Sequence, residues 1–183
     1  MSLAAPGEPS AFFREEAGRL RAAAREGPVL DVACGAGRHA LAAAALGARV
    51  VAMDRDRAAL ALLGAAARAR LLPVHPVRTD LETPHGIPAR PGVFAVILVF
   101  RFLFRPLAPA IAAALRPGGL LLYETFLEDP RPDAPGPRSP AFRLAPGELP
   151  RLFPGLEPLR HAEGVLGPPT APAVARLLAR RPA

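Results

Sequence analysis

Apolar runs alternate with helical patterns along the first two thirds of the chain. The apolar runs predict strands at residues 29–33, 48–53, 72–78, 93–99 and 120–125. Between them, stretches rich in alanine and leucine predict helices at residues 38–46, 56–70 and 107–115. This alternation is typical of an α/β protein, with a three-layer, doubly wound and mostly parallel sheet.

The two ends of the chain carry different patterns. Before the first strand, residues 9–25 predict a leading helix, with Ser10 as its N-cap. After Phe126 the chain becomes rich in proline, which predicts a loop over 127–145 above the strand ends. A short helix over 146–153 and an antiparallel pair of strands are expected to follow, the strands at residues 156–163 and 173–180. We expect one domain over 1–183, with a leading segment 1–27, a core 28–126 and a closing part 127–183.

A glycine-rich turn between the first strand and its helix carries the most informative motif. Asp31 ends the apolar run, and Gly35 and Gly37 follow it before the helix begins. Glycine lets the backbone turn tightly and lets a ligand approach without meeting a Cβ atom. The glycine spacing also fits a dinucleotide site of an NAD(P)-dependent oxidoreductase. However, a carboxylate at Asp31 would repel a pyrophosphate at this position, whereas it would attract a cationic cofactor.

Asp54 ends the second predicted strand in a corresponding place. It follows Asp31 by 23 residues, near the spacing of roughly 20 expected for an acidic residue that binds a ribose. A carboxylate accepts hydrogen bonds from both ribose hydroxyls. This spacing independently supports an adenosine-containing cofactor.

These motifs resemble the class I S-adenosylmethionine-dependent methyltransferases. The resemblance rests on Asp31-x-x-x-Gly35-x-Gly37 and on the helix-to-strand turn at residues 115–122. Segments 101–106, 123–126 and 142–149 are similar to a bacterial subgroup near the tellurite-resistance-type methyltransferases. The resemblance implies strand order 3-2-1-4-5-7-6 with an antiparallel strand seven, and S-adenosylmethionine as the cofactor.

The same resemblance implies a set of cofactor-binding residues. Asp31 and the glycine turn would hold the methionine part, Asp54 the ribose, and Asp80 with the backbone of Leu81 the adenine. The full expected set is Asp31, Ala33, Cys34, Gly35, Ala36, Gly37, Asp54, Arg55, Asp80, Leu81 and Val99.

The acceptor side is less defined by sequence. The amino-methylating enzymes of the family carry an Asp/Asn-Pro-Pro-aromatic tetrapeptide after strand four, where this chain has residues 100–103, Phe-Arg-Phe-Leu. We therefore expect a small-molecule acceptor, with Arg101 and Arg105 attracting an anionic one, and Tyr123 and Glu124 facing it. Methyl transfer depends mainly on positioning, so no catalytic base is assigned.

Charge keeps a second acceptor class open. The net charge is +7 and every basic residue is an arginine, which permits RNA binding and an RNA-modifying methyltransferase. The arginines are spread along the chain and aromatic residues are 5% of it, so a small-molecule acceptor is favoured over RNA.

Other residue patterns give expectations about location and metals. No apolar run is long enough to cross a membrane, and the N-terminus has no signal-peptide pattern, so we expect a cytoplasmic enzyme without a membrane partner. The four histidines, His85 among them, lack the spacing of metal ligands, so no metal is expected.

Overall fold

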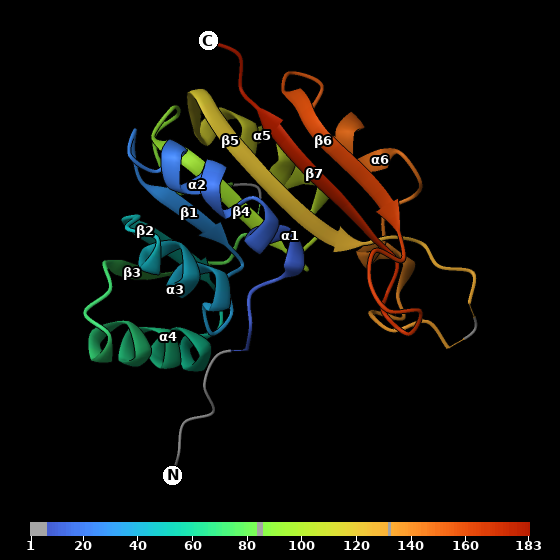
Figure 1. Cartoon of the computed structure of the whole chain (residues 1–183), viewed down its shortest axis with the longest axis horizontal. Coiled ribbons are helices and arrows are strands. Elements are labelled where there is room, and N and C mark those ends of the chain that lie inside the picture. Colours follow the sequence, from blue (N-terminus) through green and yellow to red (C-terminus); the bar gives the residue numbers. More distant parts are fainter. Residues whose placement is uncertain (1–6, 84–85, 132) are drawn as a thin grey trace.

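Seven strands form one sheet in the order β3-β2-β1-β4-β5-β7-β6 (Figure 1). The computed structural model describes residues 7–83, 86–131 and 133–183; His85 lies outside them. Strands β1 to β5 are parallel, and β7 is antiparallel to both of its neighbours. The expected strand order and fold class are confirmed. The strands are β1 (Val29–Val32), β2 (Val50–Asp54), β3 (Val74–Arg78), β4 (Phe94–Phe100), β5 (Leu115–Phe126), β6 (Glu157–Gly164) and β7 (Val174–Arg180).

Helices cover both faces of the sheet and make three layers (Figure 1). One apolar cluster packs the first four helices against one face, and a second cluster packs the other two against the opposite face. The helices are α1 (Ala11–Glu15), α2 (Ala17–Ala23), α3 (Arg38–Ala45), α4 (Arg57–Ala69), α5 (Ala108–Ala114) and α6 (Glu148–Arg151). Short 3₁₀ turns occupy Arg105–Leu107 and Pro140–Phe142.

Burial along the strands follows their place in the sheet. Every residue of β4 is buried, because this strand lies between β1 and β5 under helices on both faces. Strand β3 contains Pro76 and lies at one edge, as its prolines predicted, since an edge strand tolerates a missing backbone donor. Strand β6 forms the other edge and is largely exposed.

The leading segment differs from its prediction. It forms two short helices that meet at Glu16, whose backbone leaves the helical range at φ −96° and ψ 3°. The Glu16 carboxylate is buried and pairs with Arg160 of β6 at 2.9 Å and with Arg19 at 2.9 Å. Phe12 of α1 lies against Arg160 of β6 and Arg176 of β7, whereas α2 packs against β4 and β5. The break at Glu16 lets both helices pack on the same face of the sheet.

The segment between α5 and β5 also differs from its prediction. The sequence indicated a turn over 116–119. In the structure β5 already begins at Leu115, which pairs with Phe94 of β4. The register between the two strands is irregular between Phe94 and Val96. Gly118 has φ +75° and donates its N–H to the carbonyl of Arg181 at 2.8 Å. The tertiary partner at the end of β7 therefore keeps the proline–glycine stretch within the sheet.

The proline-rich segment lacks long helices and strands among its described residues, as predicted. It returns to the sheet through one parallel bridge between Leu127 and Leu144. Arg143 fixes the loop by donating to the carbonyls of Leu127 and Pro137, at 3.0 and 2.8 Å. The loop thus lies beside the carboxyl end of β5 (Figure 1).

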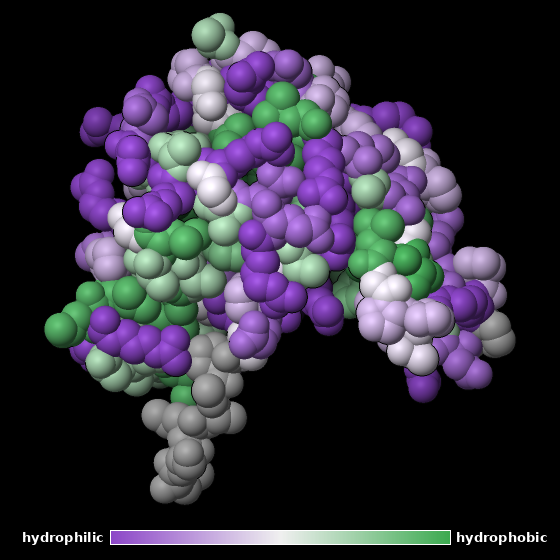
Figure 2. Space-filling view, in the orientation of Figure 1, coloured by the Kyte–Doolittle hydropathy of each residue, from purple (hydrophilic) through white to green (hydrophobic). Residues whose placement is uncertain are grey.

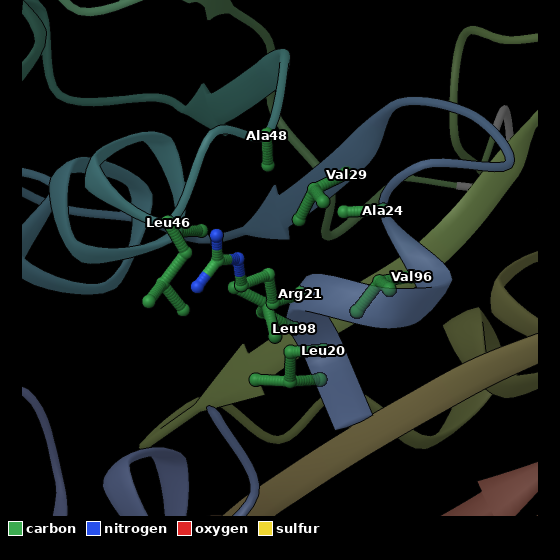
Figure 3. A pocket seen from close by; sticks show the side chains of 9 residues that line it. Leu20, Arg21, Ala24, Val29, Leu46, Ala48, Val96 and Leu98 are labelled. Atoms are coloured by element: carbon green, nitrogen blue, oxygen red, sulfur yellow. The ribbon is translucent and has the colours of Figure 1, made fainter. Parts of the chain in front are cut away.

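A small apolar cavity lies under α2, away from the glycine turn (Figure 3). Leu20, Ala24, Val29 and Leu98 are among the side chains that line it, and its volume is about 10 Å³. That is at most the space of one water, so we regard it as a packing gap of the core.

The face seen in Figure 2 is largely hydrophilic, with apolar side chains in separate patches. No helix in the described part of the chain is long and apolar enough to cross a membrane.

We predict that Gly37→Ala destabilises the protein by about 2–4 kcal/mol. Gly37 has φ +80°, and a Cβ there would lie 2.9 Å from Leu63 Cγ, inside the core. Gly47→Ala is the matched control, because Gly47 has φ +93° but no atom within 4 Å of a Cβ. Urea unfolding should show the larger loss for Gly37→Ala, and equal losses would contradict this packing role.

Candidate functional site

The carboxyl ends of β1, β2 and β4 meet at one edge of the sheet, where open α/β sheets bind their ligands. Val32 is in register with Met53 of β2 and with Val99 of β4. The chain leaves β1 through Ala33, whose φ of +52° is unusual for a residue with a side chain. Cys34 then donates its N–H to the carbonyl of Met53 at 3.0 Å, which fixes the start of the glycine turn.

Asp54 holds the glycine turn against β2. One of its carboxylate oxygens accepts the N–H of Gly35 at 2.7 Å, and the other accepts the N–H of Asp56 at 2.8 Å. Asp56 in turn caps α4 by accepting from Ala58 and Ala59. A Cβ on Gly35 would meet no atom within 4 Å, so the absence of a side chain leaves an open cradle over the turn.

A cavity of about 200 Å³ lies beside this turn, and we call it the turn cavity. It brings together five of the predicted cofactor residues from three different strand ends. Its lining is Ala33, Asp54, Arg55, Thr79, Asp80, Leu81, Glu82 and Phe102. Arg55 and Glu82 close one side of it with an ion pair of 2.7 Å.

Asp31 lies deeper, at the end of β1, and is 2% exposed. Its Oδ2 has no hydrogen-bond partner among the described residues. Burial raises the pKa of Asp31 to about 7, although the N–H of Ala40 and the charge of Arg38 act against that rise. An orphaned buried carboxylate is costly in the protein alone, and a cation bound nearby would stabilise it.

The remaining predicted cofactor residues lie around the turn. Cys34 and Ala36 are partly buried, and burial raises the pKa of the Cys34 thiol, which makes it a poor nucleophile. Val99 is fully buried in the core beside Val32. These three residues therefore belong to the packing around the glycine turn.

A second cavity of about 200 Å³ adjoins the turn cavity, and we call it the aromatic cavity. The two share Glu82 and Phe102 in their linings. The aromatic cavity is lined by Glu82, Arg101, Phe102, Leu103, Thr125, Phe126, Pro137 and Phe142. It lies where β4 and β5 end and where the proline-rich loop returns.

Of the four residues predicted to contact the acceptor, Arg101 lines the aromatic cavity and the other three have partners within the protein. Arg105 pairs with Glu148 and donates to the carbonyl of Arg143 at 2.9 Å. The buried Tyr123 hydroxyl donates to the carbonyl of Phe102 at 3.0 Å, and burial raises the pKa of Tyr123. Glu124 is buried and pairs with Arg176 of β7 at 2.7 Å.

His39 lies in the core behind the turn. Its ring stacks on Phe100 with 3.7 Å between centroids, and its Nε2 accepts the N–H of Ser10 at 3.1 Å. Burial lowers the pKa of His39 to about 3, so the neutral ring ties the leading segment to α3. No three potential metal ligands gather within the described ranges.

Sequence reasoning missed several residues that line the two cavities. Thr79 and Glu82 flank the expected adenine residues, and Thr125 lies in β5 directly after Tyr123 and Glu124, which were predicted to face the acceptor. Their positions at or just past strand ends were a usable signal. No such signal marked Phe142 as a cavity residue, because only the return of the proline-rich loop brings it to the end of β4.

The strand order and the glycine turn define a Rossmann-like cofactor-binding protein of the methyltransferase type. Residues 29–119 match the family described as a methyltransferase domain. Ribosomal protein L11 methyltransferase of Azotobacter vinelandii is 35% identical over 121 residues, which are 64% of this chain and 40% of the relative. The chain belongs to the class I S-adenosylmethionine-dependent methyltransferases, and it spans less than half the length of that curated relative.

Solved structures share the fold. TehB from Haemophilus influenzae is similar with a TM-score of 0.71 and 22% identity, over 90% of this chain and 62% of that one. The N-methyltransferase NodS from Bradyrhizobium japonicum gives 0.70 and 18%, over 94% and 97%. The 1,6-didemethyltoxoflavin-N1-methyltransferase of Burkholderia thailandensis, solved with S-adenosylhomocysteine, gives 0.69 and 22%, over 94% and 79%.

S-adenosylmethionine is the cofactor of this family, and the residues present fit it. The orphaned Asp31 carboxylate suits a ligand that carries an ammonium and a sulfonium and no phosphate. The open cradle over Gly35 leaves room for that ligand above the turn.

We predict that Asp31→Asn stabilises the protein at pH 8 by up to about 4 kcal/mol. Between pH 4 and 7 the unfolded chain ionises Asp31 while the native protein keeps it protonated, because its native pKa is about 7. The stability that Asp31 contributes is therefore complete below pH 4 and lost as the pH rises through 7. Asp31→Asn has no ionisable group at this position, so its stability does not change with pH for this reason.

Thermal unfolding of wild type and Asp31→Asn across pH 4–8 measures this difference. The two curves should converge toward pH 4. The exposed Asp133 provides the control Asp133→Asn, which should follow wild type throughout. A constant gap between wild type and Asp31→Asn at all pH values would contradict the assigned pKa.

Proposed function

We propose that the protein transfers the methyl group of S-adenosylmethionine to a small molecule bound in the aromatic cavity. The observation that carries this proposal is the pair of adjoining cavities, which share Glu82 and Phe102 at the carboxyl ends of β3 and β4. A cofactor and an acceptor bound side by side there would both contact these two side chains. Positioning of this kind supplies much of the rate of a methyl transfer.

In this proposal the Asp54 carboxylate accepts hydrogen bonds from the ribose hydroxyls, and Asp80 with the backbone of Leu81 holds the adenine. Asp31 attracts the ammonium of the methionine part, while the glycine turn gives it room. The bound cofactor supplies an electrophilic methyl group on its sulfonium. Transfer of that group would leave S-adenosylhomocysteine as the product, while Asp31, Asp54 and the glycine turn would hold the cofactor and the aromatic cavity would orient the acceptor.

The proposal assigns no catalytic base. The Tyr123 hydroxyl is buried and already donates to a carbonyl, and Glu82 is paired with Arg55. We assign Arg105, Tyr123 and Glu124 to support of the cavity wall, since all three have partners within the protein. The main work of the site is then to orient the acceptor and to keep water out.

Three finer points belong to the same proposal. The acceptor is a small molecule, the enzyme acts in the cytoplasm, and it stands near the tellurite-resistance-type subgroup. An RNA acceptor is the alternative, which the net charge of +7 keeps open. RNA affinity that falls steeply with added salt would favour it, because phosphate contacts release counterions.

Thermal unfolding with separate ligands tests the cofactor. At 100 times their dissociation constants, S-adenosylmethionine and S-adenosylhomocysteine should each stabilise the native protein by about 2.7 kcal/mol. NAD and NADP at the same concentrations should leave the midpoint unchanged, because Asp31 repels a pyrophosphate. A rise with a nicotinamide nucleotide alone would overturn the proposal.

We further predict that Asp54→Ala weakens S-adenosylhomocysteine binding about 10- to 100-fold, since it removes hydrogen bonds to a charged group. Asp54→Asn keeps an acceptor for the N–H of Gly35 and separates the loss of ribose contacts from loss of the turn. Asp133→Ala lies outside both cavities and should bind normally. Calorimetric titration that gives wild-type affinity for Asp54→Ala would remove the ribose assignment.

A further inference from the structure

Two features of the aromatic cavity indicate which kind of methyl acceptor it could bind. One is a positively charged side chain without a counter-charge, and the other is a buried hydroxyl without a hydrogen bond. Both lie among aromatic and aliphatic side chains. Together they describe the chemistry of the molecule that fits there.

The charge belongs to Arg101. Its backbone has φ +57°, which costs a residue with a side chain, and its N–H donates to the carbonyl of Glu124 at 2.8 Å. The guanidinium carbon lies 5.6 Å from the centre of the Phe126 ring. Within the described ranges no carboxylate forms an ion pair with Arg101. The turn out of β4 thus places an exposed guanidinium, without an ion-pair partner among the described residues, at the rim of the cavity.

A second cation strengthens the local positive field. Burial lowers the pKa of Arg38, the first residue of α3, and repulsion from the nearby charge of Arg101 lowers it further. Glu124 and Asp31 act in the opposite direction. An anion bound at Arg101 would relieve the repulsion.

The hydroxyl belongs to Thr125, which is 1% exposed. Its Oγ1 has no hydrogen-bond partner among the described residues, and Thr125 lines the same cavity as Arg101. A buried hydroxyl without a partner is costly, and a bound oxygen acceptor would satisfy it. Arg101 directly follows β4 and Thr125 lies near the end of the adjacent strand β5, and both line the same cavity, so both can reach one end of a small ligand.

Apart from Glu82, whose carboxylate pairs with Arg55 at 2.7 Å, the rest of the cavity lining is apolar. Phe102, Leu103, Phe126, Pro137 and Phe142 contribute to its walls, and Phe142 is 48% exposed although it is a large hydrophobic side chain. The volume of about 200 Å³ is below the range of 300–1,000 Å³ typical of drug-sized ligands. A single six-membered ring suits these walls.

From these contacts we infer that the methyl acceptor is a small aromatic carboxylate, with its carboxylate at Arg101 and Thr125 and its ring between Phe102 and Phe142. This inference rests on the proposed function, because it uses the same cavity. A hydroxyl or amino group on the ring then lies toward the wall shared with the turn cavity, where its lone pair would take the cofactor's methyl group.

Calorimetric titration with benzoate, its neutral analogue benzamide, and acetate tests the inference in the presence of saturating S-adenosylhomocysteine. Benzoate should bind at least about tenfold more tightly than benzamide, because of its charge, and than acetate, because of its ring. Equal affinity for benzoate and benzamide, or no saturable binding of benzoate, would overturn the inference.

Variants separate the two polar contacts. Arg101→Gln should weaken benzoate binding about tenfold and abolish the preference over benzamide, whereas Arg49→Gln, an exposed arginine outside the cavity lining, should bind as wild type. Thr125→Val should weaken benzoate binding several-fold, and Thr125→Ser, which keeps the hydroxyl, should restore it.

Titration of S-adenosylhomocysteine alone separates failure of this inference from failure of the proposed function. If it binds and benzoate does not, the acceptor class is wrong and the cofactor site stands. If Arg101→Gln weakens binding of S-adenosylhomocysteine and leaves the benzoate preference intact, Arg101 holds the cofactor, which overturns the inference. If S-adenosylhomocysteine does not bind wild type, both proposals fail.

Discussion

The hydrogen bond from the N–H of Gly35 to the carboxylate of Asp54 joins the two halves of the candidate cofactor site. It holds the glycine turn after β1 at 2.7 Å from the end of β2, while the second carboxylate oxygen fixes Asp56 at the start of α4. The glycine turn and the link between β2 and α4 thus share one carboxylate. The turn cavity exists because this carboxylate keeps the strand ends, the turn and the helix in register.

Asp31 adds an electrostatic constraint to that geometry. It is buried with an unpartnered oxygen, and its raised pKa makes its ionised form costly in the protein alone. A protein selected for stability alone would place an apolar residue there. The cost is understandable if a cationic cofactor is the missing partner, because a buried carboxylate then gives affinity and also excludes pyrophosphate ligands.

The acceptor side depends on the last strands and on the leading segment. Arg176 of β7 pairs with Glu124, and its guanidinium lies 5.5 Å from the centre of the Phe12 ring of α1. Arg160 of β6 binds Glu16 at the break between α1 and α2. Strands β6 and β7 thus anchor α1 and α2 over one face of the sheet, and β7 also holds the end of β5 in place. Thr125 and Arg101 owe their positions to this support.

The sequence by itself determined the strands, the glycine turn and the acidic residues at the strand ends, because apolar periodicity and glycine conformation act over a few residues. The strand order followed only from the resemblance to a known methyltransferase family. The sequence also placed Ala33, Asp54, Arg55, Asp80 and Leu81, which line one cavity. Only the tertiary structure decided the break at Glu16, the early start of β5 and the meeting of Phe142 with Arg101. These depend on contacts between residues far apart in the chain, and no local pattern encodes which partner a side chain meets.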